Sequence, residues 1–167
     1  IERADLSDNP PPKFQRLKPD SEVRFMSAYV VKCNEVIYGK DGRPAKLLCT
    51  VDPETAGCNP PDGRKIKGTI HWVSAAHAKT AEVRLYDRLF TIEDTGAIPE
   101  DKSFKDYLNP ESLTVMPNAK LEEALDGAKP GDKFQFVRMG YFCADTRNDN
   151  VFNRIVTLKD SFAKNLK

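Results

Sequence analysis

The side chains in this sequence that are best suited to chemistry are cations and an amide placed within strand-like segments. Arg24 lies between Val23 and Phe25, and Gln135 and Arg138 lie in the run Phe-Gln-Phe-Val-Arg. A guanidinium can bind a guanine edge through two hydrogen bonds, and a glutamine amide can both donate to and accept from a base edge. These residues are compatible with reading nucleic-acid bases. They are equally compatible with the exposed face of an ordinary sheet.

A second group of cations follows a proline-rich stretch. Arg64, Lys65 and Lys67 lie in a segment that we expect to form a strand. Contact with phosphates is the functional interpretation, and an edge strand guarded by cations is the structural one. The residues alone favour the edge strand.

Aromatic and titratable groups give weaker indications. The pair His71-Trp72 is suited to stacking on splayed bases, but Trp72 lies in an apolar run, which favours a core position with its N–H bonded to the backbone. His77 has no partners that predict a catalytic triad. The four cysteines form no C-x-x-C pair and lie at no zinc spacing from either histidine. We therefore expect reduced thiols, no metal site and no catalytic residue.

Composition places the chain among ordinary globular proteins. Its 167 residues carry a net charge of +1, with 40% hydrophobic and 31% charged residues. An acidic region at 91–132 separates two mildly basic parts, which permits an RNA-facing side. No apolar run approaches the roughly 20 residues that span a bilayer, and no signal peptide is evident. We expect a cytoplasmic protein, and the start at Ile1 indicates a fragment.

Short β-rich runs separated by turn residues predict an all-β fold. Asp41-Gly42 supplies the backbone angles of a tight hairpin, and the prolines within 52–63 predict a long loop. Helical turns are expected only near 103–108 and 121–125. The expected strands cover about 22–26, 29–38, 45–51, 64–73, 81–92, 112–116, 134–143 and 153–158. Many short strands of this kind are typical of a barrel or sandwich.

Several separated blocks resemble, in the same order, the anticodon-binding domain of glutaminyl-tRNA synthetases. The most specific block runs from Asp62 to Ala78 and continues from Val83 to Phe90. Shorter blocks are Val23-Arg24, 28–32, 109–113, 134–136, 140–143 and 151–154.

This resemblance implies two β-barrels with short connecting helices, related in fold to the bacterial ribosomal protein that binds 5S RNA. Residues of about 14–115 would form mainly the distal barrel. Residues of about 1–13 and 116–167 would form mainly the proximal barrel, the first of the two, truncated at its N-terminal side.

The resemblance also implies which side chains contact the anticodon. They are Arg16, Arg24, Ser27, Gln135 and Arg138. The sequence departs from the family pattern before and within the first strand. Gln15 stands where a lysine is common, and Met26 and Ser27 stand where the family often has arginine and asparagine.

The ATP-binding motifs of the family's Rossmann catalytic domain do not occur in this sequence, so we expect the chain alone to be inactive. The complete protein would attach glutamine to its tRNA with ATP and Mg²⁺. Its partners would be glutamine tRNA and its own N-terminal catalytic domain, in a monomer. Two alternatives stay open: the anticodon domain of a eukaryote-type glutamyl-tRNA synthetase, and a non-enzymatic RNA-binding β-barrel. The block from His71 to His77 favours the glutaminyl enzyme.

Overall fold

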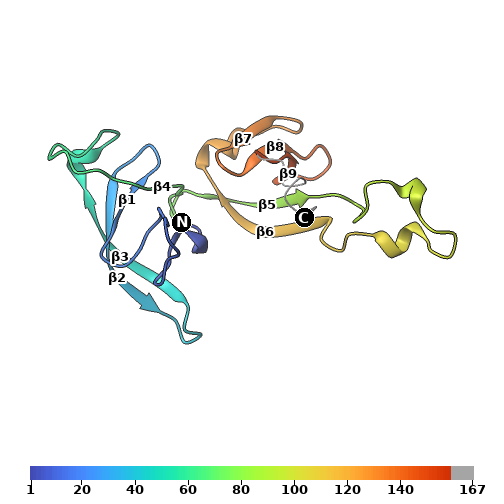
Figure 1. The fold of residues 1–167 in the computed structure, drawn as a ribbon. Coiled ribbons are helices and arrows are strands. Elements are labelled where there is room, and N and C mark those ends of the chain that lie inside the picture. The colour runs from blue at the N-terminus through green and yellow to red at the C-terminus, as the bar shows by residue number, and fades with distance from the viewer. Residues whose placement is uncertain (159–167) are drawn as a thin grey trace. The chain divides into compact units, whose positions relative to one another are not determined.

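The computed structural model describes residues 1–158, which belong to two compact units (Figure 1). The units are Ile1–Val73 and Ser74–Lys167, the second described as far as Leu158. Each contains one sheet, so the all-β class is confirmed, and no closed barrel occurs among the described residues. The division falls inside the range 14–115, so the units have other bounds than the expected barrels. The assignment of residues to a distal and a proximal barrel stays a prediction.

The first unit is built on a four-stranded sheet in the order β3-β2-β1-β4. Its strands are β1 (Glu22–Phe25), β2 (Val30–Tyr38), β3 (Pro44–Asp52) and β4 (Thr69–Ile70). Two single turns of 3-10 helix belong to this unit: η1 (Arg3–Asp5) lies before β1, and η2 (Pro53–Thr55) lies between β3 and β4. The expected hairpin turn is confirmed, because Gly42 has φ 70° and Gly39 donates to the carbonyl of Arg43 at 2.8 Å.

The core of the first unit lies on one face of this sheet. Leu17, Val23, Cys33 and Ile70 have no exposed surface. Leu17 also pairs with Leu6 in an isolated parallel bridge, which fastens the N-terminal segment to the unit.

The strand expected at 64–73 is wrong except at β4. The side chain of Arg64 is bonded to carboxylates of the sheet and of its own loop. These bonds hold the backbone near Arg64 in a loop, outside the sheet. Further along, Gly68 lies so close to Gln15 that a Cβ atom there would be 2.1 Å from the Gln15 carbonyl oxygen. The segment therefore crosses as a loop and pairs with β1, in parallel, only at Thr69–Ile70.

The second unit is built on a five-stranded sheet in the order β6-β5-β9-β8-β7. Its strands are β5 (Lys79–Tyr86), β6 (Leu113–Leu121), β7 (Lys133–Phe136), β8 (Gly140–Ala144) and β9 (Val151–Val156). Only the β5–β9 pair is parallel. The helical turns expected near 103–108 and 121–125 are confirmed as η4 (Phe104–Tyr107) and η5 (Glu123–Gly127), and η3 (Thr95–Ala97) is a further one.

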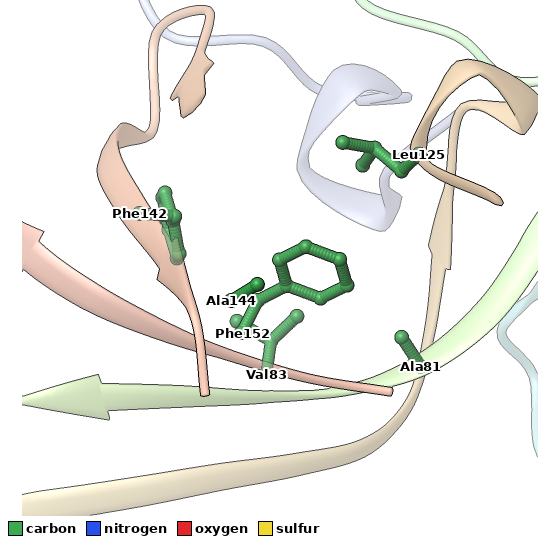
Figure 2. Close-up of a cluster of buried hydrophobic side chains, with 6 residues drawn as sticks. All are labelled: Ala81, Val83, Leu125, Phe142, Ala144 and Phe152. Carbon is green, nitrogen blue, oxygen red and sulfur yellow. The ribbon is translucent and has the colours of Figure 1, made fainter. Parts of the chain in front are cut away.

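Aromatic rings fill the core of the second unit. Figure 2 shows Phe152 and Phe142 rising from the sheet beside Ala81 and Val83, with Leu125 of η5 opposite. The ring of Phe142 stacks on that of Phe136 with centroids 4.2 Å apart. This packing fixes β7 and β8 on the sheet, and with them the turn that joins the two strands.

Three strand predictions in the second unit need correction. The run 81–92 ends as a strand at Tyr86, and the run 112–116 extends to Leu121. Pro117 is tolerated within β6 because β6 is an edge strand. It pairs with β5 on one side only, and proline has no N–H to donate on the other. The run 134–143 is a hairpin, because residues 137–139 turn the chain.

Candidate nucleic-acid interface

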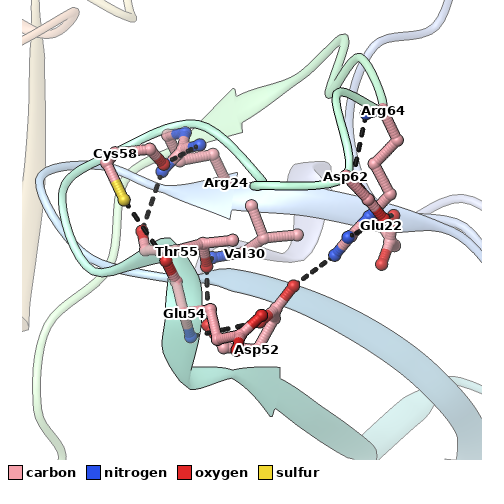
Figure 3. Close-up of polar contacts among 9 residues, drawn as sticks. All are labelled: Glu22, Arg24, Val30, Asp52, Glu54, Thr55, Cys58, Asp62 and Arg64. Carbon is pink, nitrogen blue, oxygen red and sulfur yellow. Dashed lines mark hydrogen bonds and ion pairs between the residues drawn. The ribbon is translucent and has the colours of Figure 1, made fainter.

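Arg24 lies on β1 and its guanidinium is bonded to a neighbouring loop (Figure 3). Nη1 donates to the carbonyl of Thr55 at 3.3 Å, and Nη2 donates to the carbonyl of Cys58 at 2.7 Å. A guanidinium has five N–H donors in a planar fork, so two such bonds do not exhaust it. Arg24 thus holds the loop that follows β3, and its further donors are the ones that a base contact would use.

Hydrogen bonds of the buried Thr55 side chain also hold the loop that Arg24 contacts. The Thr55 side chain is fully buried, its hydroxyl donates to the carbonyl of Asp52 at 2.6 Å, and it accepts the N–H of Val30 at 2.8 Å. The Asp52 carboxylate accepts the N–H of Glu54 and so caps η2. Sequence inspection missed Thr55, although Asp-Pro-Glu-Thr, with a capping Asp before Pro, was a readable signal for such a turn.

Arg64, a candidate for phosphate contact, is bonded to three carboxylates. It reaches Glu22 at 3.0 Å and Asp62 at 2.6 Å, and its Nη2 bonds to Asp52. The hydrogen bond to Asp52, followed by those to Asp62 and Glu22, raises the pKa of Arg64, and the Arg64 backbone N–H, followed by its side chain, lowers that of Asp62. Three anions around one cation leave a local negative excess, which disfavours a phosphate at this place. Arg64 fastens the loop to β1 and β3.

Arg16 and Ser27 also belong to the first unit. Arg16 is 45% exposed at its side chain, donates to the carbonyl of Ala4 at 3.0 Å and lies 3.3 Å from the buried carboxylate of Asp5. Ser27 is exposed in the turn between β1 and β2, with φ 55°. Asparagine adopts such left-handed angles more readily than serine.

Gln135 and Arg138 lie at the end of one hairpin in the second unit. Gln135 is exposed on β7, while Phe134 and Phe136 pack against the core as their alternation predicts. Arg138 is exposed in the turn from β7 to β8 with φ 69°. In one continuous strand the two side chains would lie on opposite faces of the sheet. The turn at 137–139 ends the strand before Arg138, so this alternation does not apply to it. They are three residues apart across the end of a hairpin.

Trp72 is half-buried and lines a groove of the first unit, so the core position favoured by its sequence is confirmed only in part. Its ring stacks on that of Phe25 with centroids 5.8 Å apart, and its Nε1 donates to the carbonyl of Met26 at 3.1 Å. This contact supports the turn that carries Ser27. His77 lies exposed in a turn, and its backbone N–H donates to Ser74.

A polar network in the second unit was not singled out from the sequence. Asp145 accepts from the Asn153 side chain at 2.6 Å and from the backbone N–H groups of Arg147 and Asn148, both at 2.8 Å. These bonds, that from Asn153 first, hold the pKa of Asp145 well below its ordinary value. Arg84 lies 3.9 Å from the same carboxylate and 2.6 Å from Glu82. The network joins the β8–β9 loop to β5 and β9.

Within residues 1–158 no group of three or more His, Cys, Asp or Glu side chains is arranged to hold a metal ion. Across the same residues, no helix has the length and apolarity needed to cross a membrane.

Comparison with known proteins identifies the family. Two family models, both described as the anticodon-binding domain of class I tRNA synthetases (E and Q), match residues 1–52 and 69–145. The chain belongs to this family. Within this anticodon-binding domain, the first match contains Arg16, Arg24 and Ser27, and the second contains Gln135 and Arg138.

Similar proteins are glutamine–tRNA ligases. The enzyme of Pseudomonas syringae pv. tomato is 46% identical over 166 residues, covering 97% of this chain and 29% of the relative. That of Rhodopirellula baltica is 47% identical over 167 residues, covering 98% of this chain and 28% of the relative. That of Vibrio vulnificus is 47% identical over 168 residues, with 98% and 30% covered. The anticodon-binding domain described here thus spans less than a third of the length of these relatives.

Proposed function

We propose that this chain is the anticodon-reading part of a glutamine–tRNA ligase. Sequence identity of about 46% along nearly the whole chain to proteins of that name supports the amino-acid specificity. The exposed amide and guanidinium at the end of the β7–β8 hairpin are the observation that carries the RNA contact. Anticodon bases are read on edges that become accessible when they leave the loop stack.

In this proposal Gln135 and Arg138 read the central uridine of the glutamine anticodon. A glutamine amide can donate to one uracil carbonyl and accept from the uracil N–H, and the guanidinium of Arg138 adds donors to the other carbonyl or the adjoining phosphate. A site built from such groups rejects a wrong base because its polar atoms lose their partners.

Arg16, Arg24 and Ser27 contact the other anticodon positions in this proposal. Arg24 has a double role, since it holds the 55–58 loop and directs further donors to a base. Arg16 is exposed and is held by η1 through Ala4 and Asp5, which limits the directions of its fork. A guanidinium already held in place loses less conformational entropy on binding than a mobile one.

For the complete protein we propose ATP-dependent attachment of glutamine to its tRNA. Mg²⁺ and ATP would be bound by a catalytic domain of the same protein, which would act as a monomer in the cytoplasm. The names of the relatives support the reaction, and the length they have beyond this chain supports the separate catalytic domain.

The test is aminoacylation by the complete protein with each amino acid and each tRNA. We expect charging of glutamine tRNA with glutamine and no charging of glutamate tRNA with glutamate. The family description covers both E and Q enzymes, so the reverse result would assign the chain to the glutamyl branch. Failure to charge either tRNA would overturn the proposal.

A further inference from the structure

Two cysteines of the first unit face each other across β2 and β3. Cys33 and Cys49 are register partners in this antiparallel pair. The N–H of Cys33 donates to the carbonyl of Ser21 at 3.0 Å, and the carbonyl of Cys33 accepts the N–H of Asp20 at 2.9 Å. Both backbone groups of Cys33 therefore point away from β3. Cys33 and Cys49 form a non-hydrogen-bonded pair, the type whose side chains lie closest.

This pairing matches what a disulfide requires. In a non-hydrogen-bonded antiparallel pair the Cα atoms are about 4.5 Å apart, and disulfides join residues whose Cα atoms are about 4.4–6.8 Å apart. The Cys33 thiol donates to the carbonyl of Glu35 at 3.8 Å, a long bond that a rotation of its side chain breaks. Oxidation thus requires rotation of two side chains and no rearrangement of the sheet.

The two thiols differ in access. Cys33 has no exposed surface and packs with Val23 and Ile70, whereas Cys49 is exposed. Cys49 lines an open groove of about 940 Å³ beside Leu47 and Val51. A small oxidant reaches Cys49 from this groove, and Cys33 lies behind it as the thiol that completes the reaction.

We propose that Cys33 and Cys49 are a redox modification site that forms a reversible disulfide with hydrogen peroxide as oxidant. The Cys49 thiolate attacks one peroxide oxygen, the O–O bond breaks, and the released hydroxide takes a proton to give water and a sulfenic acid on Cys49. The Cys33 thiolate then attacks that sulfur, the S–O bond breaks, and the released hydroxide takes the proton that the Cys33 thiol had lost and leaves as a second water. Two thiols are oxidised by two electrons, and one peroxide is reduced to two waters.

Desolvation by the surrounding protein raises the pKa of both thiols, so thiolate is scarce at neutral pH. The site therefore reacts slowly near pH 7 and faster in alkali, by up to about tenfold per pH unit while thiolate stays the minor form. Because the disulfide forms slowly, it accumulates only when the oxidant is present for a long time. The bond closes the β2–β3 hairpin and restricts the unfolded chain.

The other cysteines provide matched controls. Cys58 is exposed and its thiol donates to the carbonyl of Glu54 at 3.2 Å, and Cys143 lies opposite Lys133 in the second unit. Neither has a cysteine as strand partner among residues 1–158.

The test uses the complete protein, treated with hydrogen peroxide at pH 7 and pH 9, then alkylated under denaturing conditions and digested. We expect a linked peptide pair containing Cys33 and Cys49, lighter by two hydrogens than the reduced peptides, forming faster at pH 9 and lost on treatment with dithiothreitol. Cys49→Ser, an exposed change that spares the core, should abolish the link, and Cys58→Ser and Cys143→Ser should keep it. Sulfinic acid at Cys49 with Cys33 still alkylatable would overturn the proposal, as would linkage of Cys49 to another cysteine.

Discussion

The expected anticodon residues of the two units differ in what their side chains do within the protein. In the first unit, Arg24 and Arg16 donate to backbone carbonyls, and Arg16 also pairs with Asp5. In the second unit, the Gln135 side chain is exposed on β7. An arginine expected to contact RNA can therefore also hold the backbone of its own unit in place. We infer that substitutions in the first unit change stability and RNA binding together, and that those at Gln135 change RNA binding alone.

Among substitutions in the first unit, Thr55→Val should have the largest effect on stability and tRNA charging together. The change removes a buried hydroxyl and leaves the Val30 N–H without its acceptor, so the free energy of unfolding of the first unit should fall by about 1–3 kcal/mol. Charging of tRNA should weaken as well, because the loop that Arg24 holds loses its support. Denaturant unfolding measures the first effect and the specificity constant for tRNA the second.

Thr50→Val is the control for this change. Thr50 is exposed on β3, and within residues 1–158 its hydroxyl bonds only to the Asn34 side chain, at 3.4 Å. Loss of this hydroxyl should alter stability by less than about 0.5 kcal/mol. Equal effects of the two substitutions would show that Thr55 does not hold the loop.

Arg24→Ala should have the next largest effect, and it should be double. Loss of the bonds to Thr55 and Cys58 should cost about 1 kcal/mol of stability, and loss of a base contact should lower the specificity constant for tRNA by about tenfold or more. The affinity for ATP should not change. Arg43→Ala, in the exposed β2–β3 turn, is the control and should change neither quantity. A loss of stability with unchanged charging would make Arg24 a scaffold residue only.

The outcome at Arg24 illustrates where sequence reasoning succeeded and where it stopped. Alternation placed Phe134 and Phe136 against the core, because local patterns report burial directly. For Trp72 the expected bond of its N–H to the backbone is present, but its ring is half-buried and lines a groove. The bond of Arg24 to Thr55 and that of Arg64 to Glu22 join residues 31 and 42 positions apart, which no local pattern reports. The turn at Arg138 was missed because a non-glycine residue adopts the left-handed angle there.

A smaller effect, confined to the second unit, concerns acid stability. Hydrogen bonds in the folded state depress the pKa of Asp145, so this group contributes stability above its ordinary value of about 4 and loses it as pH falls toward the folded value. Acid unfolding followed by hydrogen exchange should show the second unit losing protection below pH 4. Asp145→Asn should flatten that dependence, and Asp149→Asn, an exposed carboxylate in the same loop, should leave it unchanged. An unaltered profile in Asp145→Asn would remove this network from the acid response.

The most direct test of the central claim compares Gln135→Ala with the unchanged protein on tRNAs substituted singly at each anticodon position. Charging should lose discrimination at the middle base by about 10–100-fold, with little change at the two neighbours and with the free energy of unfolding unchanged within about 0.5 kcal/mol. That result would distinguish the second unit, which would then read a base with an exposed amide, from the first. An equal loss at all three positions would contradict it, because a residue that only positions the RNA backbone affects every base alike.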